Sequence, residues 1–197
     1  MIEIEFYQND DVCAIARNLI GMELFTHFEG DLCSGYIVET EAYAGINDKA
    51  SHAYGGRFTS RTSTMYENGG IAYVYLCYGM HALFNVVTNK KGIPHAVLIR
   101  AIQTHLGYNS MAKRRNFPKN EKLLGNGPGT LTKSLGIQLK HNGLSLNSSN
   151  LYIKKGLEIN PKEIISSPRV GVAYAKEDAK LPYRYRLKGN PFCSPAK

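Results

Sequence analysis

The sequence has few cysteines, and none of them stands at the spacing of a metal site. The four cysteines are scattered, with no Cys-x-x-Cys pair and no paired histidines nearby; they are Cys13, Cys33, Cys77 and Cys193. This scatter argues against a structural zinc site and against a redox dithiol. We therefore expect reduced thiols, no metal and no cofactor.

Signals for secretion and for membrane insertion are also lacking. Residues Met1–Glu5 carry two glutamates where a signal peptide needs a basic region followed by an apolar one. No apolar run approaches the roughly 20 residues of a membrane span. We therefore expect a cytoplasmic protein that makes no contact with a membrane.

Acidic residues are outnumbered by basic ones. The chain of 197 residues has 24 Lys and Arg against 16 Asp and Glu, which gives a net charge of +8 and a pI near 9.3. This surplus favours a polyanionic partner through long-range attraction and counterion release, although an ordinary basic protein has the same composition. A hydrophobic fraction of 43% is typical of a folded chain. No repeat or linker divides the sequence, so we expect residues 1–197 to form a single domain.

Hydrophobic patterning predicts a domain rich in strands. A helix should start after the capping pair Asp10–Asp11 and stop at Gly21. The other elements expected in chain order are a strand region over 24–43 broken at 29–31, a loop over 44–70, a hairpin from the runs 71–78 and 82–88, a strand over 96–102, a helix containing 111–115 and a short helix after 125–129. Few of these strands look parallel. We therefore expect an α+β fold around a curved, mostly antiparallel sheet.

Two glutamates, Glu39 and Glu41, share one face of the predicted strand because side chains alternate along a strand. Two carboxylates on one face raise each other's pKa and can divide acid and base roles. The commoner arrangement is an ion pair with an arginine on a wet sheet face. The pattern Glu-x-Glu alone leaves both interpretations open.

The predicted loop over 44–70 holds a histidine and two arginines. Long loops in compact domains are usually functional or disordered. His52 follows Glu41 by eleven residues, and its neighbours offer no metal ligands. Arg57 and Arg61 can grip phosphates, and they can equally be ordinary surface arginines.

Tyrosines gather on the first strand of the predicted hairpin. Tyr73 and Tyr75 share one strand face, where aromatic residues usually pack in the core or across strands. Tyr78 instead lies beside the hairpin tip Gly79–His81, where core packing does not account for it. In a basic chain, such a tyrosine is a candidate wedge between base pairs.

A glycine-rich segment, Gly125–Gly129, precedes a short predicted helix. It lacks the Gly-Lys-Ser/Thr ending of a phosphate-binding loop, which excludes a nucleoside-triphosphate site of that kind. The backbone amides at the start of this helix can still hold a DNA phosphate.

Short motifs along the chain together resemble the alkyladenine (3-methyladenine) DNA glycosylase family in its compact bacterial form. Six of them, in order, are Val38–Tyr43, Ser51–His52, Gly55–Arg57, Tyr73–Tyr75 through Tyr78–Met80, Leu98–Ala101 and Gly127–Gly129. The similarity covers nearly the whole chain and extends to Arg169–Val172. Each motif alone is weak, but six at compatible spacing are specific. The resemblance implies a single mixed domain with a protruding hairpin.

The resemblance also implies a reaction. A monofunctional DNA glycosylase of base excision repair flips an alkylated purine, such as 3-methyladenine, out of duplex DNA. It then hydrolyses the N-glycosidic bond and leaves an abasic site. Glu41 would activate the water, Arg100 would help hold it, and a main-chain carbonyl near Val172 would complete its shell. Glu39 would be structural. We further expect a monomer that approaches double-stranded DNA from the minor groove and associates with the bacterial nucleoid.

Further roles follow from the same resemblance. Tyr43 and His52 would stack on the flipped base from one side, and Tyr75 from the other. Asn85 would lie at the pocket edge, where it can oppose a purine bearing a 2-amino group. Tyr78 would fill the gap that the extruded nucleotide leaves. The other expected DNA contacts are Met80, His81, Arg57, Arg61, Gly127 and Gly129.

Two positions depart from the family pattern. Thr130 stands where a lysine is expected after Gly127–Gly129, so that one phosphate contact is lost or moves to Lys133. His81 stands where the mammalian form has a tyrosine, which changes the contacts at the hairpin tip.

Three other functions fit parts of the pattern. A bifunctional glycosylase would form a Schiff base through a lysine and nick the strand, although no lysine lies within the motifs. A non-catalytic nucleic-acid-binding module would use the same basic, aromatic surface without releasing a base. A protein-interaction domain would not bind DNA even at low salt.

Overall fold

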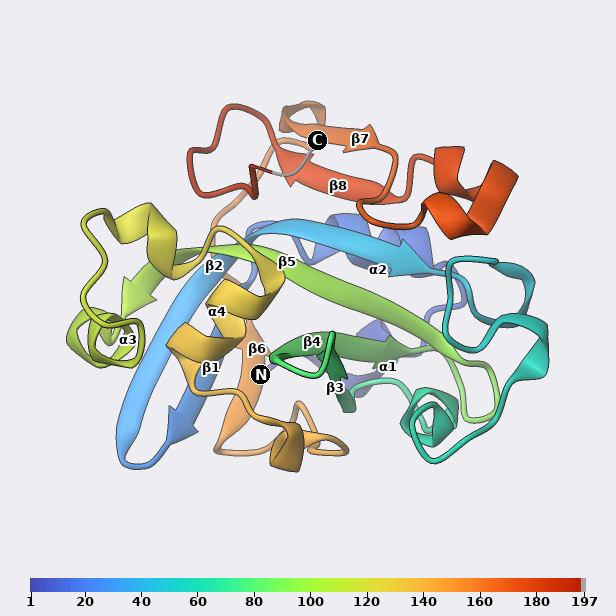
Figure 1. The fold of residues 1–197 in the computed structure, drawn as a ribbon, viewed down its shortest axis with the longest axis horizontal. Helices are drawn as coiled ribbons and strands as arrows, with labels where there is room; N and C mark the ends of the chain where they lie inside the picture. Colours follow the sequence, from blue (N-terminus) through green and yellow to red (C-terminus); the bar gives the residue numbers. More distant parts are fainter. Residues whose placement is uncertain (196–197) are drawn as a thin grey trace.

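The computed structural model describes residues 1–195, and Figure 1 shows its strands joined in one curved sheet. Six strands lie in the order β3-β4-β5-β2-β1-β6, while β8 pairs with both β2 and β7. The strands are β1 (Glu23–Phe28), β2 (Asp31–Tyr43), β3 (Ala72–Cys77), β4 (His81–Thr88), β5 (His95–Leu106), β6 (Leu151–Lys154), β7 (Ile164–Ser167) and β8 (Arg184–Leu187). The paired strands of this sheet run antiparallel. The expected α+β class with an antiparallel sheet is confirmed.

The helices are short and lie between or beside the strands. They are α1 (Ile4–Tyr7), α2 (Val12–Asn18), α3 (Tyr108–Arg114) and α4 (Pro128–Leu135). Single turns of 3-10 helix occur at Gly45–Asn47, Tyr54–Gly56, Ser63–Tyr66, Glu121–Leu124, Leu139–His141 and Pro161–Glu163, and a longer 3-10 segment spans Ala173–Lys180. The predicted loop over 44–70 therefore contains three 3-10 turns and no strand.

Helix α2 begins where the sequence predicts it. The carboxylate of Asp11 accepts hydrogen bonds from the backbone amides of Cys13 at 2.9 Å and Ala14 at 3.0 Å. These bonds satisfy two amides that lack partners inside the helix. The chain leaves the helix through Gly21, whose φ of +87° lies in the left-handed region that suits glycine.

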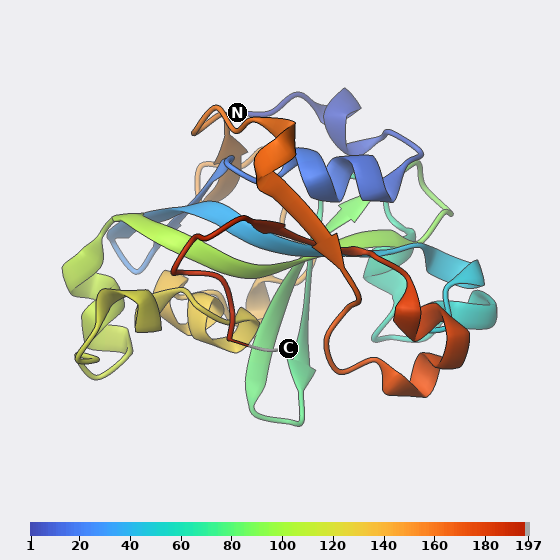
Figure 2. The same ribbon diagram turned by 90° about the horizontal axis from the view of Figure 1, so that it is seen from above.

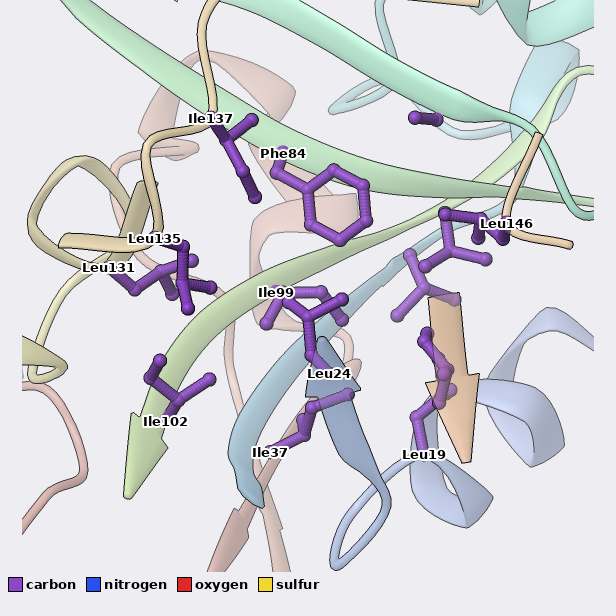
Figure 3. Close-up of a cluster of buried hydrophobic side chains, with 14 of the residues drawn as sticks. Leu19, Leu24, Ile37, Phe84, Ile99, Ile102, Leu131, Leu135, Ile137 and Leu146 are labelled. Carbon is purple, nitrogen blue, oxygen red and sulfur yellow. The ribbon is translucent and has the colours of Figure 1, made fainter. Parts of the chain in front are cut away.

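The sheet has helices on both faces, and strand alternation decides which face each side chain enters. Figure 2 shows α2 on one side of β2 and β5, with α3 and α4 on the other. The Thr40 hydroxyl donates to the carbonyl of Ala16 in α2 at 2.8 Å. Glu39 and Glu41, its neighbours on β2, therefore point to the opposite face. Figure 3 shows the apolar side chains that fill the core, among them Leu24, Ile37, Phe84, Ile99, Ile102, Leu131, Leu135 and Ile137.

Strand β2 is the centre of the sheet. It pairs with β5 along one edge, and on its other edge first with β1 and then, from Glu39 to Glu41, with β8. The β2–β5 register shifts twice near this point. Glu39 lies opposite Ala101 and Thr40 opposite Ile99, so Arg100 is an extra residue on β5. Such a bulge redirects a side chain, and here it turns Arg100 toward both glutamates.

The β3–β4 hairpin projects away from the rest of the ribbon, as Figure 2 shows, in agreement with the expected protruding hairpin. Cys77 pairs with His81 across its end, and the amide of Met80 donates to the carbonyl of Cys77 at 3.1 Å. Tyr78 and Gly79, at the centre of the turn, have φ values of +49° and +69°. Two positive φ values are what a tight type I′ hairpin turn requires.

The four cysteines are free thiols, with Cys33 buried and the others half-buried. Within residues 1–195, no helix is long and apolar enough to cross a bilayer. The same residues contain no group of three or more histidine, cysteine, aspartate or glutamate side chains that could hold a metal ion.

Candidate active site

A cavity of about 440 Å³ opens along one side of the hairpin. This volume lies within the range of small-molecule pockets. The predicted site residues that line it are Tyr43, His52, Arg61, Tyr75, Tyr78, Asn85, Arg100 and Val172. They come from β2, β3, β4 and β5, from the hairpin turn, and from two loops that are more than a hundred residues apart in the chain. The structure therefore brings together residues that the sequence related only by motif order.

Glu41 lies under this cavity and is completely buried. One carboxylate oxygen accepts the backbone amide of Val170 at 2.7 Å and lies 3.2 Å from the Arg100 guanidinium. The other oxygen accepts the Tyr43 hydroxyl at 2.9 Å. Those three partners line the cavity, although Glu41 itself does not. The carboxylate is thus fixed in one position directly behind the cavity wall.

Glu39 has a different environment from Glu41. Its carboxylate accepts hydrogen bonds from the guanidinium groups of Arg100 at 2.7 Å and Arg184 at 2.8 Å. Ser194 adds its backbone amide at 2.6 Å and its hydroxyl at 2.9 Å. Glu39 is fully buried and fully partnered away from the cavity, so it holds Arg100 rather than facing a ligand.

Arg100 is a buried cation shared by two carboxylates. Burial opposes its charged form, but the carboxylates of Glu41 and Glu39 raise the pKa of its guanidinium above the ordinary value. Burial and the neighbouring Glu41 carboxylate raise the pKa of the Tyr43 hydroxyl well above its usual range. Tyr43 therefore stays protonated at neutral pH and can keep donating to Glu41.

Aromatic rings form one side of the cavity. The Nδ1 atom of His52 lies 3.0 Å from the Tyr73 hydroxyl, and its ring meets that of Tyr75 edge to face with centroids 4.7 Å apart. The Arg61 guanidinium covers the Tyr75 ring at 4.8 Å from the centroid, and it lies 3.5 Å from the Nε2 atom of His52. In this conformation His52 and Arg61 occupy the space next to Tyr75.

His52 should remain neutral in mildly acidic solution. Burial, and then the positive charges of Arg61 and Arg57, lower the pKa of its imidazole to about 4. We expect the ring resonances of His52, assigned with a His52→Gln variant, to show no titration in NMR spectra between pH 5.5 and 8. A midpoint near the ordinary value of about 6.5 would contradict this environment.

The same shift predicts how stability depends on pH. Between about pH 4 and 6.5 the unfolded chain holds a proton on His52 that the folded chain does not. This histidine therefore lowers the free energy of unfolding as the pH falls through that window and has no such effect above it. His52→Gln should flatten this part of the stability curve in urea titrations.

Asn85 is buried in the cavity wall. Its side-chain amide donates to the backbone carbonyl of Tyr73 on the adjacent strand at 3.1 Å. The two residues are cross-strand partners in the hairpin register. Asn85 is therefore held in one orientation by the hairpin that frames the cavity.

A second and wider groove, of about 960 Å³, runs on the other side of the hairpin against α4. The predicted DNA contacts that line it are Tyr78, Met80, His81, Gly127 and Gly129, together with Thr130 and Lys133. A Cβ at position 129 would lie only 3.1 Å from the Cβ of His81, which is why a glycine suits this contact. Arg57 lines neither hollow and is exposed.

Tyr78 is the most exposed large hydrophobic side chain at the hairpin tip, at 89% of its full accessibility, followed by Met80 at 74%. It also borders both the cavity and the groove. Tyr78 and Met80 therefore form an exposed apolar tip between the two hollows.

Sequence reasoning missed several partners of the site. Arg184 and Ser194 reach Glu39 from 145 and 155 residues away, and no local motif marks either of them. Arg169, the first residue of the motif Arg169–Val172, forms a buried bidentate pair with Asp48 beside Tyr43. An arginine directly before Val170–Val172 is the one signal that the sequence offers for it.

Comparison with known proteins gives a consistent result. The family model described as methylpurine-DNA glycosylase matches residues 5–191. A protein of Chlamydia felis named as a 3-methyladenine DNA glycosylase is 48% identical over 188 residues, which cover 95% of this chain and 96% of the relative. Similarly named proteins of Chlamydia abortus and Bacillus cytotoxicus are 48% and 44% identical, over 95% and 96% of this chain and 98% and 97% of theirs.

The match therefore spans most of the chain, including the strands, the loop and the hairpin that build the cavity. The chain belongs to the methylpurine-DNA glycosylase family, and it is a DNA N-glycosylase.

Proposed function

We propose that residues 1–197 act as a single monofunctional glycosylase domain that releases 3-methyladenine and related alkylated purines from duplex DNA. The Glu41 carboxylate supports this function most strongly, because it is buried and held by three groups behind an aromatic cavity. We further propose that the protein is a cytoplasmic, nucleoid-associated monomer that approaches DNA from the minor groove.

The cavity suits a cationic base. Alkylation at a ring nitrogen makes a purine nucleotide positively charged, and aromatic faces attract a cation. Tyr43, Tyr75 and a neutral His52 line the cavity, so none of these three side chains repels that charge. For the base to lie between them, His52 must move from Tyr75, and the Arg61 guanidinium must leave the Tyr75 ring. Asn85 at the wall would oppose a 2-amino group and so disfavour guanine.

Glu41 would act on a water molecule at the sugar. A cationic base is a good leaving group, so the protein needs mainly a placed water and a negative charge near a sugar with oxocarbenium character. Glu41 would take the proton of the water, while Arg100 and the main chain near Val172 would hold it. The partners of Glu41 all line the cavity, whereas Arg184 and Ser194, which hold Glu39, do not, so Glu41 would be the base.

Base flipping would be assisted from the hairpin tip. Extruding a nucleotide costs a few kcal/mol of stacking and pairing, and Tyr78 would fill the gap. Met80, His81, Gly127 and Gly129 in the groove, with Arg57 and Arg61 in the loop, would contact the DNA around it. The net charge of +8 supports binding to the phosphate backbone.

Tyr78→Ala should weaken binding to duplex DNA that carries an abasic analogue. Base–aromatic stacking contributes about 1–3 kcal/mol, so the Kd should rise roughly tenfold in fluorescence anisotropy titrations. Tyr108→Ala, which removes a half-exposed tyrosine from α3, is the matched control and should leave the Kd unchanged. If Tyr78→Ala and the wild type bound this duplex with equal affinity, Tyr78 would not act as a wedge.

The reaction itself distinguishes the proposal from its alternatives. Methylated duplex incubated with the protein should yield free 3-methyladenine and a strand that breaks only after hot alkali. Borohydride added during the reaction should trap no covalent adduct. An adduct would indicate a lysine Schiff base and a bifunctional lyase, and tight DNA binding without released base would indicate a non-catalytic module.

A further inference from the structure

Behind Tyr43 lies a buried ion pair between Arg169 and Asp48. The guanidinium donates to both oxygens of the Asp48 carboxylate, at 2.5 and 2.8 Å, and to the backbone carbonyl of Ala42 at 2.9 Å. The side chains of Arg169 and Asp48 are exposed by only 0% and 2%. This pair is thus withdrawn from solvent, where electrostatic effects are strong.

The guanidinium of Arg169 lies over the Tyr43 ring, 4.9 Å from its centroid. Tyr43 lines the cavity, whereas Arg169 does not. Arg169 therefore covers the ring from the side away from the cavity. A base stacked on the cavity side of Tyr43 would share this ring with a protein cation.

A ring between two cations binds each of them less well than a ring that faces only one. The first cation draws the π electrons toward itself, and the two positive charges also repel through the ring. The carboxylate of Asp48 removes this conflict because its charge cancels that of Arg169. The Asp48 carboxylate is also held in place by the backbone amides of Ala44 and Ala50, which donate to it at 3.0 Å each.

We infer that Asp48 is a specificity-determining residue that neutralises Arg169 behind Tyr43 and so keeps the aromatic cavity selective for positively charged purines. The inference rests on the proposed function of the cavity. Arg169 then orders the Tyr43 ring and the adjoining Val170 without opposing the charge of the lesion. Asp48 and Arg169 themselves do not touch the base.

The size of the effect follows from the geometry. With the Arg169 guanidinium 4.9 Å from the ring and a base stacked on the other face, the two charges are about 8 Å apart. At an effective dielectric constant of about 20, an unneutralised Arg169 weakens binding of a cation roughly thirtyfold and leaves a neutral base unaffected. Since the asparagine dipole screens part of this charge, we expect about tenfold for Asp48→Asn.

The test compares two bases of the same shape. One duplex carries 3-methyladenine, which is cationic, and the other carries its uncharged isostere 3-deaza-3-methyladenine, both on 2′-fluoro sugars that resist hydrolysis. The wild type should bind the cationic duplex more tightly, and Asp48→Asn should reduce this preference about tenfold. Contacts to the DNA backbone and the fraction of folded protein affect both Kd values equally, so they do not change the ratio of the two values.

Two further variants separate charge from structure. Arg169→Met removes the cation, so its preference for the cationic duplex should equal or exceed that of the wild type, and it keeps the test open if Asp48→Asn fails to fold. Asp31→Asn removes a carboxylate from another arginine pair, with Arg114 at 3.0 Å, and should leave the ratio unchanged.

The outcomes are distinct. The role of Asp48 would be overturned if Asp48→Asn kept the wild-type preference for the cationic duplex. It would also be overturned if Arg169→Met lost that preference. Equal binding of both duplexes by the wild type would overturn this inference together with the proposed cation recognition. The proposed glycosylase activity would not be affected by that result, because the release of 3-methyladenine tests it separately.

Discussion

Glu41→Gln should slow the release of 3-methyladenine from duplex DNA by about a thousandfold while leaving the protein folded and able to bind the lesion. General base catalysis contributes about 10²- to 10⁴-fold, and a glutamine can neither accept the proton of water nor offset positive charge on the sugar. Single-turnover rates with enzyme in excess measure the chemical step without interference from product release.

The substitution is compatible with the surroundings of Glu41. A glutamine oxygen can still accept the amide of Val170 and the Arg100 guanidinium, and its amide can donate to Tyr43 once that hydroxyl turns to accept. Glu67→Gln changes an exposed glutamate that pairs with Lys91 at 3.5 Å and should keep the wild-type rate. A Glu41→Gln protein within tenfold of that rate would show that another group activates the water.

Glu39→Ala should lower the free energy of unfolding by about 3–5 kcal/mol, the usual cost of removing one partner from a buried ion pair. The carboxylate lies between Arg100 and Arg184, which are almost completely buried, so its loss leaves two guanidinium groups side by side without their shared anion. Urea unfolding followed by circular dichroism measures the change.

The matched control for this prediction is Glu67→Ala. Because Glu67 and Lys91 are exposed by 52% and 69%, their ion pair should contribute less than about 1 kcal/mol. If Glu39→Ala costs no more than this control, Glu39 is not the anchor of Arg100 that the geometry indicates.

Local patterns were sufficient to predict the elements that frame the site. Runs of strand-forming residues predicted β2 and the two strands of the hairpin, and Asp11 predicted the start of α2; the structure confirms these elements. These predictions succeeded because each depends on residues a few positions apart, such as an aspartate and the amides it caps.

The arrangement around the two glutamates could not be predicted in the same way. The sequence places Glu39 and Glu41 on one strand face as equals, and their difference comes from partners distant in the chain. Arg184 and Ser194 occupy Glu39, whereas Val170 and Tyr43 hold Glu41. The bulge that lets Arg100 reach both carboxylates is a register shift between β2 and β5. The sequence of either strand alone contains no signal for such a shift.

In the proposed reaction, the Glu41 carboxylate supplies a negative charge to a sugar that becomes positive in the transition state. The most direct measurement compares duplexes whose abasic site is a cationic pyrrolidine or a neutral tetrahydrofuran, which have the same shape and need no turnover. The wild type should bind the pyrrolidine duplex at least about tenfold more tightly than the tetrahydrofuran duplex, and Glu41→Gln should bind both equally. Equal affinities in the wild type, or a preference that survives in Glu41→Gln, would contradict this role of Glu41.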